Sequence, residues 1–475
     1  MIFSEPRFLW FFALVFAGYW ALRTNAPRKW LLLAASLYFY GSWDVRFLGL
    51  IVGCATVDWF VSGRIHRAQA AGRKGTGWLL VSLAYDLGTL GFFKYFNFFA
   101  ASGAELLRWL GIPVGEVTLS IVLPVGVSFF TFQAMSYTID VYRRELTPVR
   151  SYPDFLLFIT FFPQLVAGPI VRAATFLPQL GTAKRFVDVD VHRALGQFLA
   201  GFVKKAVVAD LISGPADAVF AAPSSYDATS IWIAVVCYAV QIYCDFSGYT
   251  DMAIGSARLL GYELCENFRW PYLATSITDF WRRWHMSLST WLRDYLYIAL
   301  GGNRGTRWFT HRNLLLTMLL GGLWHGAGWN FVVWGAIHGV ALVVHKEWVR
   351  RIGAGRMPWL DRLVTIYTVL LAWIFFRATS FADAWAMAKA WLWFASPGTK
   401  TLPVWDGLPN VVPVALLGLC LAPLLVLHVA ASLGVPARLR RHLPAWLVTL
   451  LFGVLAAVAL SCMPQNAKPF IYFQF

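Results

Sequence analysis

The sequence predicts an all-α, polytopic membrane protein with roughly 11 to 13 membrane segments, some of them re-entrant. First, 59% of its 475 residues are hydrophobic and only 13% are charged, whereas soluble domains are about half apolar and about one quarter charged. Second, the apolar runs are long and continuous and do not alternate as transmembrane β-strands do. Third, the basic residues that give the net charge of +16 lie in short clusters between these runs, as the positive-inside rule requires. This composition excludes a soluble globule, a disordered chain and a nucleic-acid partner.

The first apolar run covers 8–22, with Glu5 before it and Arg23, Arg28 and Lys29 behind it. A signal peptide carries its positive charge in front and a small-residue cleavage site behind. We therefore interpret 8–22 as an uncleaved first span.

The spans that follow are identified by their length and apolar content, because a helix needs about 20 apolar residues to cross about 30 Å of hydrocarbon. Several are short or contain Pro or Gly, which a membrane tolerates only where protein or a cavity covers the opened backbone. The run 154–170, with Pro163, Gly168 and Pro169, is the clearest interrupted segment. The predicted spans are 8–22, 30–43, 45–63, 78–100, 119–139, 154–170, 192–213, 230–247, a stretch inside 313–345, 363–376, 411–432 and 445–462.

The basic clusters predict the orientation of the chain. They lie at 23–29, 64–74, 143–150, 346–362 and 438–441. If all of them are cytoplasmic, the last span, 445–462, leaves the cytoplasm, and the aromatic tail 464–475 lies on the periplasmic side. We see no internal repeat and no attached soluble module, so residues 1–475 are predicted to form a single membrane-embedded domain.

Metal and disulfide chemistry are not expected. The six cysteines form no CxxC pair and most lie in apolar runs, so we interpret them as small buried hydrophobes. They are Cys54, Cys237, Cys244, Cys265, Cys420 and Cys462. No HExxH motif, nucleophile elbow or phosphate loop occurs, which leaves phosphoryl transfer and serine hydrolysis without support.

An amphipathic stretch follows the eighth predicted span. Its apolar residues fall on one face at helical spacing: Phe280, Trp284, Leu288, Trp291 and Tyr295. We expect a helix that Thr278 or Asp279 caps and that Gly301-Gly302 ends. A helix lying in the membrane interface explains its arginines and tryptophans, but not His285 near its middle.

The stretch 313–345 contains no Asp, Glu, Lys or Arg, and His325 lies within it in the sequence Gly-Gly-Leu-Trp-His-Gly-Ala-Gly. His325 is 13 positions after Arg312, or about 20 Å along a helix. Both flanks are basic, so the chain is expected to enter the membrane and return, with a turn at the glycines. An ionisable side chain at such depth indicates function, and the glycines would let a substrate approach the backbone. For His338 and His345 we favour neutral core histidines bonded to a carbonyl.

A buried neutral imidazole suits proton abstraction from a hydroxyl group. His325 is therefore a candidate base for the attack of a hydroxyl on an activated acyl group. The charged residues near it are interpreted as members of ion pairs that hold the helices: Asp245, Asp251, Asp279, Arg282, Arg283 and Arg293.

Several motifs together resemble the membrane-bound O-acyltransferase superfamily over nearly the whole chain. They are 129–137, 161–170, 245–251, 280–296 with His285, 323–326 with His325, and 470–475. The chain is most similar to the branch that O-acetylates bacterial exopolysaccharides such as alginate and cellulose, with the D-alanine-exporting branch as a near relative. Each motif is weak alone, but the combination is specific.

The resemblance implies a ring of helices around a central funnel in the bacterial inner membrane. His325 matches the catalytic histidine of the superfamily, and His285 matches a second functional histidine of this branch. The acyl donor it implies is a cytoplasmic thioester, acetyl-CoA. A separate periplasmic acetyltransferase of the SGNH type is the expected partner.

The C-terminal tail reproduces a pattern proposed to carry the acyl group in the D-alanine relatives, with Phe470, Tyr472 and Phe475 at the matching positions. In the relay that this suggests, His325 deprotonates Tyr472, which attacks acetyl-CoA and presents acetyl-tyrosine outward. The alternatives are direct transfer at His325, or an aromatic belt that only anchors the C-terminus. Other functions left open are a D-alanyl, lipid or protein O-acyltransferase, a transporter or flippase, and a passive scaffold.

Overall fold

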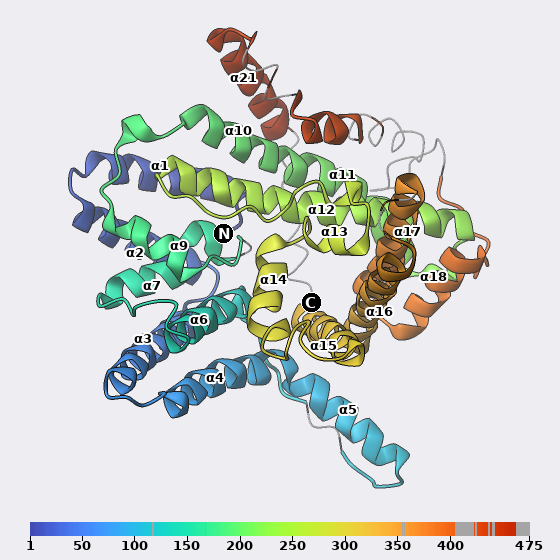
Figure 1. The fold of residues 1–475 in the computed structure, drawn as a ribbon. Coiled ribbons are helices and arrows are strands. Elements are labelled where there is room, and N and C mark those ends of the chain that lie inside the picture. The colour runs from blue at the N-terminus through green and yellow to red at the C-terminus, as the bar shows by residue number, and fades with distance from the viewer. Residues whose placement is uncertain are drawn as a thin grey trace. The chain divides into compact units, whose positions relative to one another are not determined.

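The structure is a computed structural model that describes residues 1–461 except for 116–117, 167, 354, 356, 404–421, 423–424, 436–437 and 439–441. All named elements in these residues are helices, and their β-type contact is an isolated bridge between Tyr226 and Lys400 (Figure 1). The all-α prediction is therefore confirmed. The tail 464–475 with Tyr472 lies outside the described residues, as does most of the predicted span 411–432.

The chain divides into two compact units, the first formed by Met1–Phe198 and Met252–Cys265. In this unit α3 packs against α4, α6 and α7, and α2 packs against α1 and α7 (Figure 1). Its elements are α1 (Pro6–Ala21), α2 (Asn25–Gly41), η1 (Val45–Phe47), α3 (Leu48–Ala70), α4 (Thr76–Leu90), η2 (Gly91–Tyr95), α5 (Phe96–Trp109), α6 (Val127–Tyr142), α7 (Tyr152–Thr160), α8 (Phe162–Leu165), α9 (Ala173–Gly181) and η3 (Phe186–Asp188).

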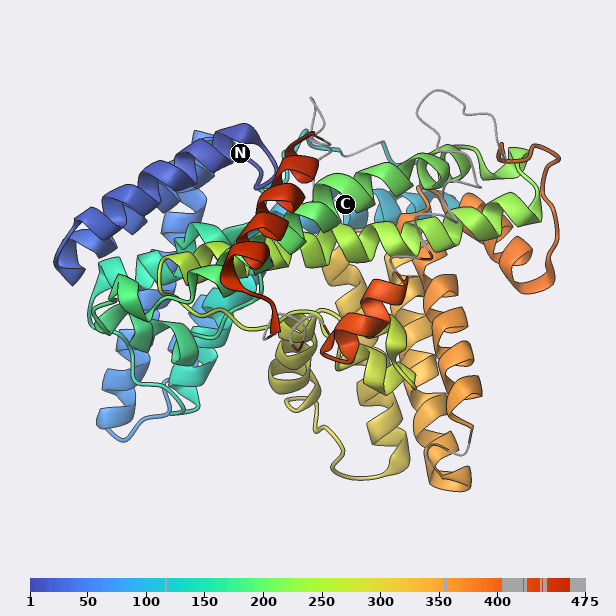
Figure 2. The same ribbon diagram turned by 90° about the horizontal axis from the view of Figure 1, so that it is seen from above.

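The second unit consists of Leu199–Asp251 and Glu266–Phe475. In it α15 packs along α16, and α16, α17 and α18 pack against one another (Figures 1 and 2). Two helices, α10 (Val191–Phe202) and α12 (Ala228–Leu259), run from one unit into the other. The remaining elements are η4 (Val203–Ala209), α11 (Asp210–Ala221), η5 (Pro223–Ser225), η6 (Pro271–Leu273), α13 (Ile277–Trp281), α14 (Met286–Trp291), η7 (Leu292–Tyr297), α15 (Arg307–His325), α16 (Trp329–Ile352), α17 (Pro358–Arg377), α18 (Phe381–Trp393) and α21 (Ala445–Ser461).

Three described helices are long and apolar enough to cross a membrane by length and composition: Val45–Ala70, Ala228–Leu259 and Pro358–Arg377. Other predicted spans form shorter or interrupted helices. The run 78–100, for example, is divided between α4, the π-helical segment η2 and α5. Together with the apolar composition, these helices make the chain an all-α, polytopic membrane protein.

The predicted interruption in 154–170 is confirmed. α7 ends at Thr160 and α8 begins at Phe162. The side-chain amides of Gln133 and Gln164 both donate to the carbonyl oxygen of Phe158, at 3.2 and 2.5 Å. Side chains thus satisfy the backbone that the break opens, as a membrane protein requires.

The interpretation of the cysteines as plain buried hydrophobes is correct only in part. Cys237 and Cys244 are buried, but Cys265 is exposed. The buried thiol of Cys54 lies against the two carboxylates of Asp58 and Asp86. This is not the environment of a plain hydrophobic residue, because buried carboxylates need a balancing charge or a proton. Cys420 and Cys462 lie outside the described residues.

Candidate active site

His325 lies at the end of α15, in a helical hairpin whose turn is formed by Gly326-Ala327-Gly328. The predicted turn at the glycines is therefore confirmed, and the path of the hairpin through the membrane stays a prediction. The glycines, however, serve helix packing: a Cβ at Gly322 would lie 2.2 Å from the carbonyl oxygen of Phe331, and one at Gly326 would lie 2.1 Å from the Phe331 ring. The expectation that these glycines open the backbone to a substrate is wrong at these two positions, because Phe331 fills the space.

The imidazole of His325 is surrounded by aromatic rings from three helices. Its centroid lies 5.0 Å from that of Trp324, 4.9 Å from that of Trp334 and 5.3 Å from that of Phe376, all edge-on. The residue is 3% exposed. A charged imidazolium would lose its hydration here at a large free-energy cost, so this environment favours the neutral ring, which can accept a proton.

His285 occupies a backbone conformation that the sequence pattern did not predict. It lies between α13 and α14 with φ 42° and ψ 53°, in the left-handed region. The expected continuous helix is therefore broken at His285, and Ser276 caps α13 in place of Thr278 or Asp279. A non-glycine residue in this region costs roughly 1–3 kcal/mol, which the surrounding contacts must offset.

Asn267 supplies those contacts. Its Oδ1 lies 3.1 Å from His285 Nδ1 and accepts hydrogen bonds from the backbone N–H and the hydroxyl of Ser287, at 3.1 and 2.8 Å. Its own carbonyl oxygen accepts from the backbone N–H of Met286 at 2.9 Å. Because an amide oxygen only accepts, Nδ1 of His285 carries the proton, and Nε2 is the basic nitrogen of the neutral ring.

The structure brings the two predicted histidines together. The ring centroids of His285 and His325 are 6.5 Å apart, and Trp324 lies within 6.0 Å of His285. Phe246 of α12 packs edge-on against His285 at 4.7 Å. Two buried imidazoles from separate segments thus face one small, mostly aromatic region, which suits proton transfer to and from a bound hydroxyl or thiol. The third predicted residue, Tyr472, lies outside the described residues.

His338 and His345 have structural contacts, as expected, although with side chains and not with carbonyl groups. Trp281 Nε1 donates to Nδ1 of His338 at 3.3 Å. The hydroxyl of Thr278 lies 3.0 Å from Nδ1 of His345. Both histidines therefore fix α16 to α13.

A cavity of about 720 Å³ lies within the second unit, and neither His285 nor His325 is among its lining residues. Its apolar wall includes Trp281, Met318 and Met286, the residue that follows His285. Its polar lining includes three basic side chains that are exposed to solvent: Arg282, Arg293 and Lys346. The cavity thus combines an apolar wall, which includes the residue after His285, with a positively charged rim.

The ends of α15 and α16 beside this cavity are basic. Glu347 interacts with Arg307, His311 and Arg350 at 3.5, 3.1 and 2.7 Å. The hydrogen bond from Arg350 is the main reason why the pKa of Glu347 is lowered. This carboxylate balances only part of the positive charge at these helix ends.

The predicted ion pairs are confirmed for four of the six residues, with lysine partners that the sequence analysis missed. Arg293 pairs only with the adjacent Asp294 at the surface, and Arg282 is exposed and forms no ion pair in the described part of the chain. Asp245 pairs with Lys205 at 2.5 Å and Asp251 pairs with Lys204 at 2.6 Å, both in η4. Asp279 pairs with Arg283 at 2.9 Å. Two adjacent lysines inside the apolar run 192–213 were the available signal, because ions at membrane depth need counter-ions. Asn267 gave no comparable signal.

The chain is similar to known proteins over most of its length. The family model described as MBOAT, membrane-bound O-acyltransferase, matches residues 127–384. The chain is 42% identical over 402 residues to the probable alginate O-acetylase AlgI of Pseudomonas aeruginosa, covering 83% of this chain and 76% of the relative. It is 37% identical over 511 residues to the protein of the same name in Azotobacter vinelandii, covering both chains fully. A peptidoglycan O-acetyltransferase of Helicobacter pylori is 38% identical over 424 residues, with 82% of this chain and 79% of the relative covered.

Proposed function

The chain belongs to the membrane-bound O-acyltransferase family, and from this premise we propose that it passes acetyl groups from a cytoplasmic thioester across the membrane for O-acetylation of an exported polysaccharide. Relatives whose names state the O-acetylation of alginate or of peptidoglycan support this substrate class. We propose that residues 1–475 act as a single catalytic domain, in the bacterial inner membrane.

The observation that carries the proposal is the pair of buried imidazoles, His285 and His325, with ring centroids 6.5 Å apart. In the proposed reaction His325 takes the proton of an acceptor hydroxyl, whose oxygen attacks the thioester carbonyl carbon. The carbon–sulfur bond breaks, and the leaving thiolate takes up a proton. In this reaction Nε2 of His285, which is left basic by the Asn267 contact at Nδ1, would exchange a proton with one of these groups.

We propose that acetyl-CoA is the donor and that it enters the cavity lined by Met286 and Arg282. Its phosphates would meet the basic rim formed by Arg282, Arg293 and Lys346, and its thioester end would reach the apolar wall that includes Met286. Charge-assisted contacts to phosphate are about twice as strong as neutral hydrogen bonds. The basic cavity therefore supports a phosphate-bearing thioester as the donor.

Two routes remain for the acetyl group after it leaves the donor. In the relay, the Tyr472 hydroxyl is the acceptor, and a periplasmic acetyltransferase of the SGNH type takes the group from the tail 464–475. In direct transfer, the final acceptor itself enters the site. D-alanyl, lipid or protein acylation and a transporter or flippase are less supported, because relatives 36–42% identical over most of the chain are named as alginate O-acetylases.

The test is polysaccharide acetylation in cells that express His325→Ala at the level of the unchanged protein. We expect a fall of about 100-fold or more, the usual contribution of a general base. His338→Gln is the matched control, because His338 is also fully buried but contacts Trp281. Undiminished acetylation in His325→Ala would refute the catalytic role, and polysaccharide movement without acetylation would favour a transporter.

A further inference from the structure

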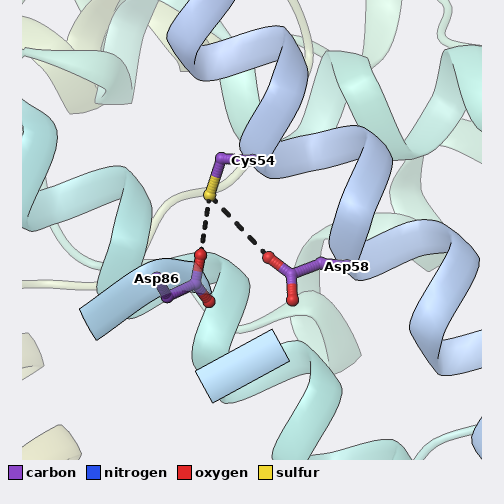
Figure 3. A group of neighbouring side chains, drawn as sticks. All are labelled: Cys54, Asp58 and Asp86. Carbon is purple, nitrogen blue, oxygen red and sulfur yellow. Dashed lines mark hydrogen bonds between the residues drawn. The ribbon is translucent and has the colours of Figure 1, made fainter. Parts of the chain in front are cut away.

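A second cluster of reactive side chains lies in the first unit and has no part in the proposed reaction. Cys54 and Asp58 lie one turn apart on α3, and Asp86 approaches them from α4 (Figure 3). Cys54 Sγ is 3.0 Å from Asp86 Oδ1 and 3.8 Å from Asp58 Oδ2. All three residues are 0% exposed, and one ligand atom from each lies within 4.8 Å of the others.

The charge of this cluster is not balanced by the protein around it. No Lys, Arg or His in the described part of the chain forms an ion pair with Asp58 or Asp86. Asp86 Oδ2 is buried and has no hydrogen-bond partner among the described atoms. Burying two neighbouring carboxylates without compensation is highly unfavourable. A bound cation or shared protons must therefore neutralise them.

The hydrogen bonds around Asp58 favour a cation. Ser82 and Thr138 both donate to Asp58 Oδ1, at 2.5 and 2.9 Å, so this oxygen is fixed by α4 and α6 while Oδ2 faces Cys54. Hydrogen bonds that orient a carboxylate from behind are typical of metal ligands. Asp86 turns Oδ1 toward Cys54, and its buried Oδ2 has no hydrogen-bond partner in the described part of the chain.

The spacing of the atoms selects the ion. Zinc binds thiolate at about 2.3 Å and carboxylate oxygen at about 2.0 Å, so a tetrahedral site separates sulfur from oxygen by about 3.5 Å. The two sulfur–oxygen distances here, 3.0 and 3.8 Å, fall on either side of that value. A thiolate ligand disfavours Mg²⁺ and Ca²⁺, which prefer oxygen alone.

We propose that Cys54, Asp58 and Asp86 bind one zinc ion, which links α3 to α4 as a structural site. The Cys54 thiol loses its proton to water on binding, so that one thiolate and two carboxylates face the divalent ion and the net charge of the cluster falls from −2 to −1. The sequence analysis expected no metal chemistry anywhere in the chain and interpreted Cys54 as a buried hydrophobe, so this proposal departs from that expectation.

The test is elemental analysis of the full-length protein, purified in detergent through a tag that does not bind metal. We expect one zinc per chain in the unchanged protein, and less than a tenth of that in a Cys54→Ser/Asp86→Asn double variant. Cys237→Ser is the matched control and should keep its zinc, because Cys237 is also buried and lies in the other unit. As a second readout, replacement of zinc by Co²⁺ should give a thiolate-to-cobalt charge-transfer band in the unchanged protein.

Three results would overturn the proposal. The first is unchanged protein with far less than one zinc per chain and no cobalt–thiolate band, which would mean that protons neutralise the cluster. The second is the same zinc content in the double variant. The third is another metal at one per chain. If the double variant does not fold, the zinc content and cobalt spectrum of the unchanged protein decide the question.

Discussion

The left-handed backbone of His285 shows how a single residue can be set by a distant partner. Local patterning placed His285 inside a regular helix, because the apolar residues from Phe280 to Tyr295 keep helical spacing. The break arises because Asn267, 18 positions earlier, binds the imidazole and also the start of the next helix. A contact of this kind is formed by the tertiary fold, so spacing along the chain could not predict it.

Replacing Asn267 by Leu should destabilise the protein and impair acetylation. The change leaves two buried donors of Ser287 without their acceptor, at about 1–3 kcal/mol for each unsatisfied group. It also frees His285 Nδ1 from the contact that fixes its proton. We expect a clear fall in melting temperature in detergent, measured together with acetylation.

The matched control for this prediction is Ser287→Ala, which removes one of the donors and keeps the Asn267–His285 contact. It should cost less stability than Asn267→Leu and should preserve most of the activity. Equal loss of activity in both variants would mean that the fixed proton on His285 has no special role.

Replacing Tyr472 by Phe removes one hydroxyl group from the tail and keeps its aromatic ring. In the relay this hydroxyl carries the acetyl group, so acetylation should stop while the amount of folded protein in the membrane is unchanged. Acetylation of the polysaccharide and recovery of folded protein are measured together. Full activity in Tyr472→Phe would reject the relay and favour direct transfer at His325, whereas loss of folded protein would favour an anchoring role.

At the scale of elements, the α15–α16 hairpin is the part of the site that the sequence predicted best. A long stretch without charge between two basic flanks indicated a chain that enters and returns, and the glycine cluster indicated its turn. The purpose of the individual glycines could not be predicted, because it depends on which residue of α16 faces them. That residue is Phe331, whose carbonyl oxygen and ring occupy the space beside Gly322 and Gly326.

Gly322→Ala should therefore open or strain the hairpin. The added Cβ would lie 2.2 Å from a backbone oxygen, which cannot rotate away as a side chain can. Forcing a methyl group into such packing costs typically about 1–3 kcal/mol. We expect a lower melting temperature in detergent and reduced acetylation, because His325 lies one turn further along α15.

Gly328→Ala is the control, since the nearest atom to its Cβ would be a Phe331 ring carbon at 3.6 Å, an ordinary contact. The free energy of unfolding of this variant should lie within about 1 kcal/mol of that of the unchanged protein, as expected for a substitution that meets no close neighbour. If Gly322→Ala were as stable as Gly328→Ala, the close approach of the two helices would not matter for the site.

At the scale of the whole molecule, composition and charge predicted the class of protein, while contacts between segments decided its details. The basic clusters and apolar runs were enough for an all-α membrane protein. They did not predict where helices are interrupted. The π-helical segment η4, for example, contains Lys204 and Lys205, which form ion pairs with Asp251 and Asp245 of α12. The ring of helices around a funnel stays a prediction.

The sidedness of the reaction depends on the whole topology. If the basic ends of the helices are cytoplasmic, the cavity with its rim of Arg282, Arg293 and Lys346 opens to the cytoplasm. Labelled acetyl-CoA should then acylate the protein or its partner in inverted membrane vesicles. In right-side-out vesicles the protein or its partner should become labelled only after the membrane is permeabilised. Equal labelling of both vesicle types when intact would contradict the proposed orientation.

The same assay tests whether the basic rim of the cavity binds the donor. Arg282→Gln removes one charge that would meet a phosphate. A hydrogen bond to a charged group contributes about 1.5 kcal/mol or more to binding, so the KM of acetyl-CoA should rise about tenfold. kcat should change much less, because the lost contact is the same in the ground state and the transition state. Arg64→Gln, an exposed charge over Phe60 in the first unit, is the control and should leave KM unchanged. If Arg282→Gln instead lowered kcat about tenfold and left KM unchanged, this arginine would not contribute to donor binding.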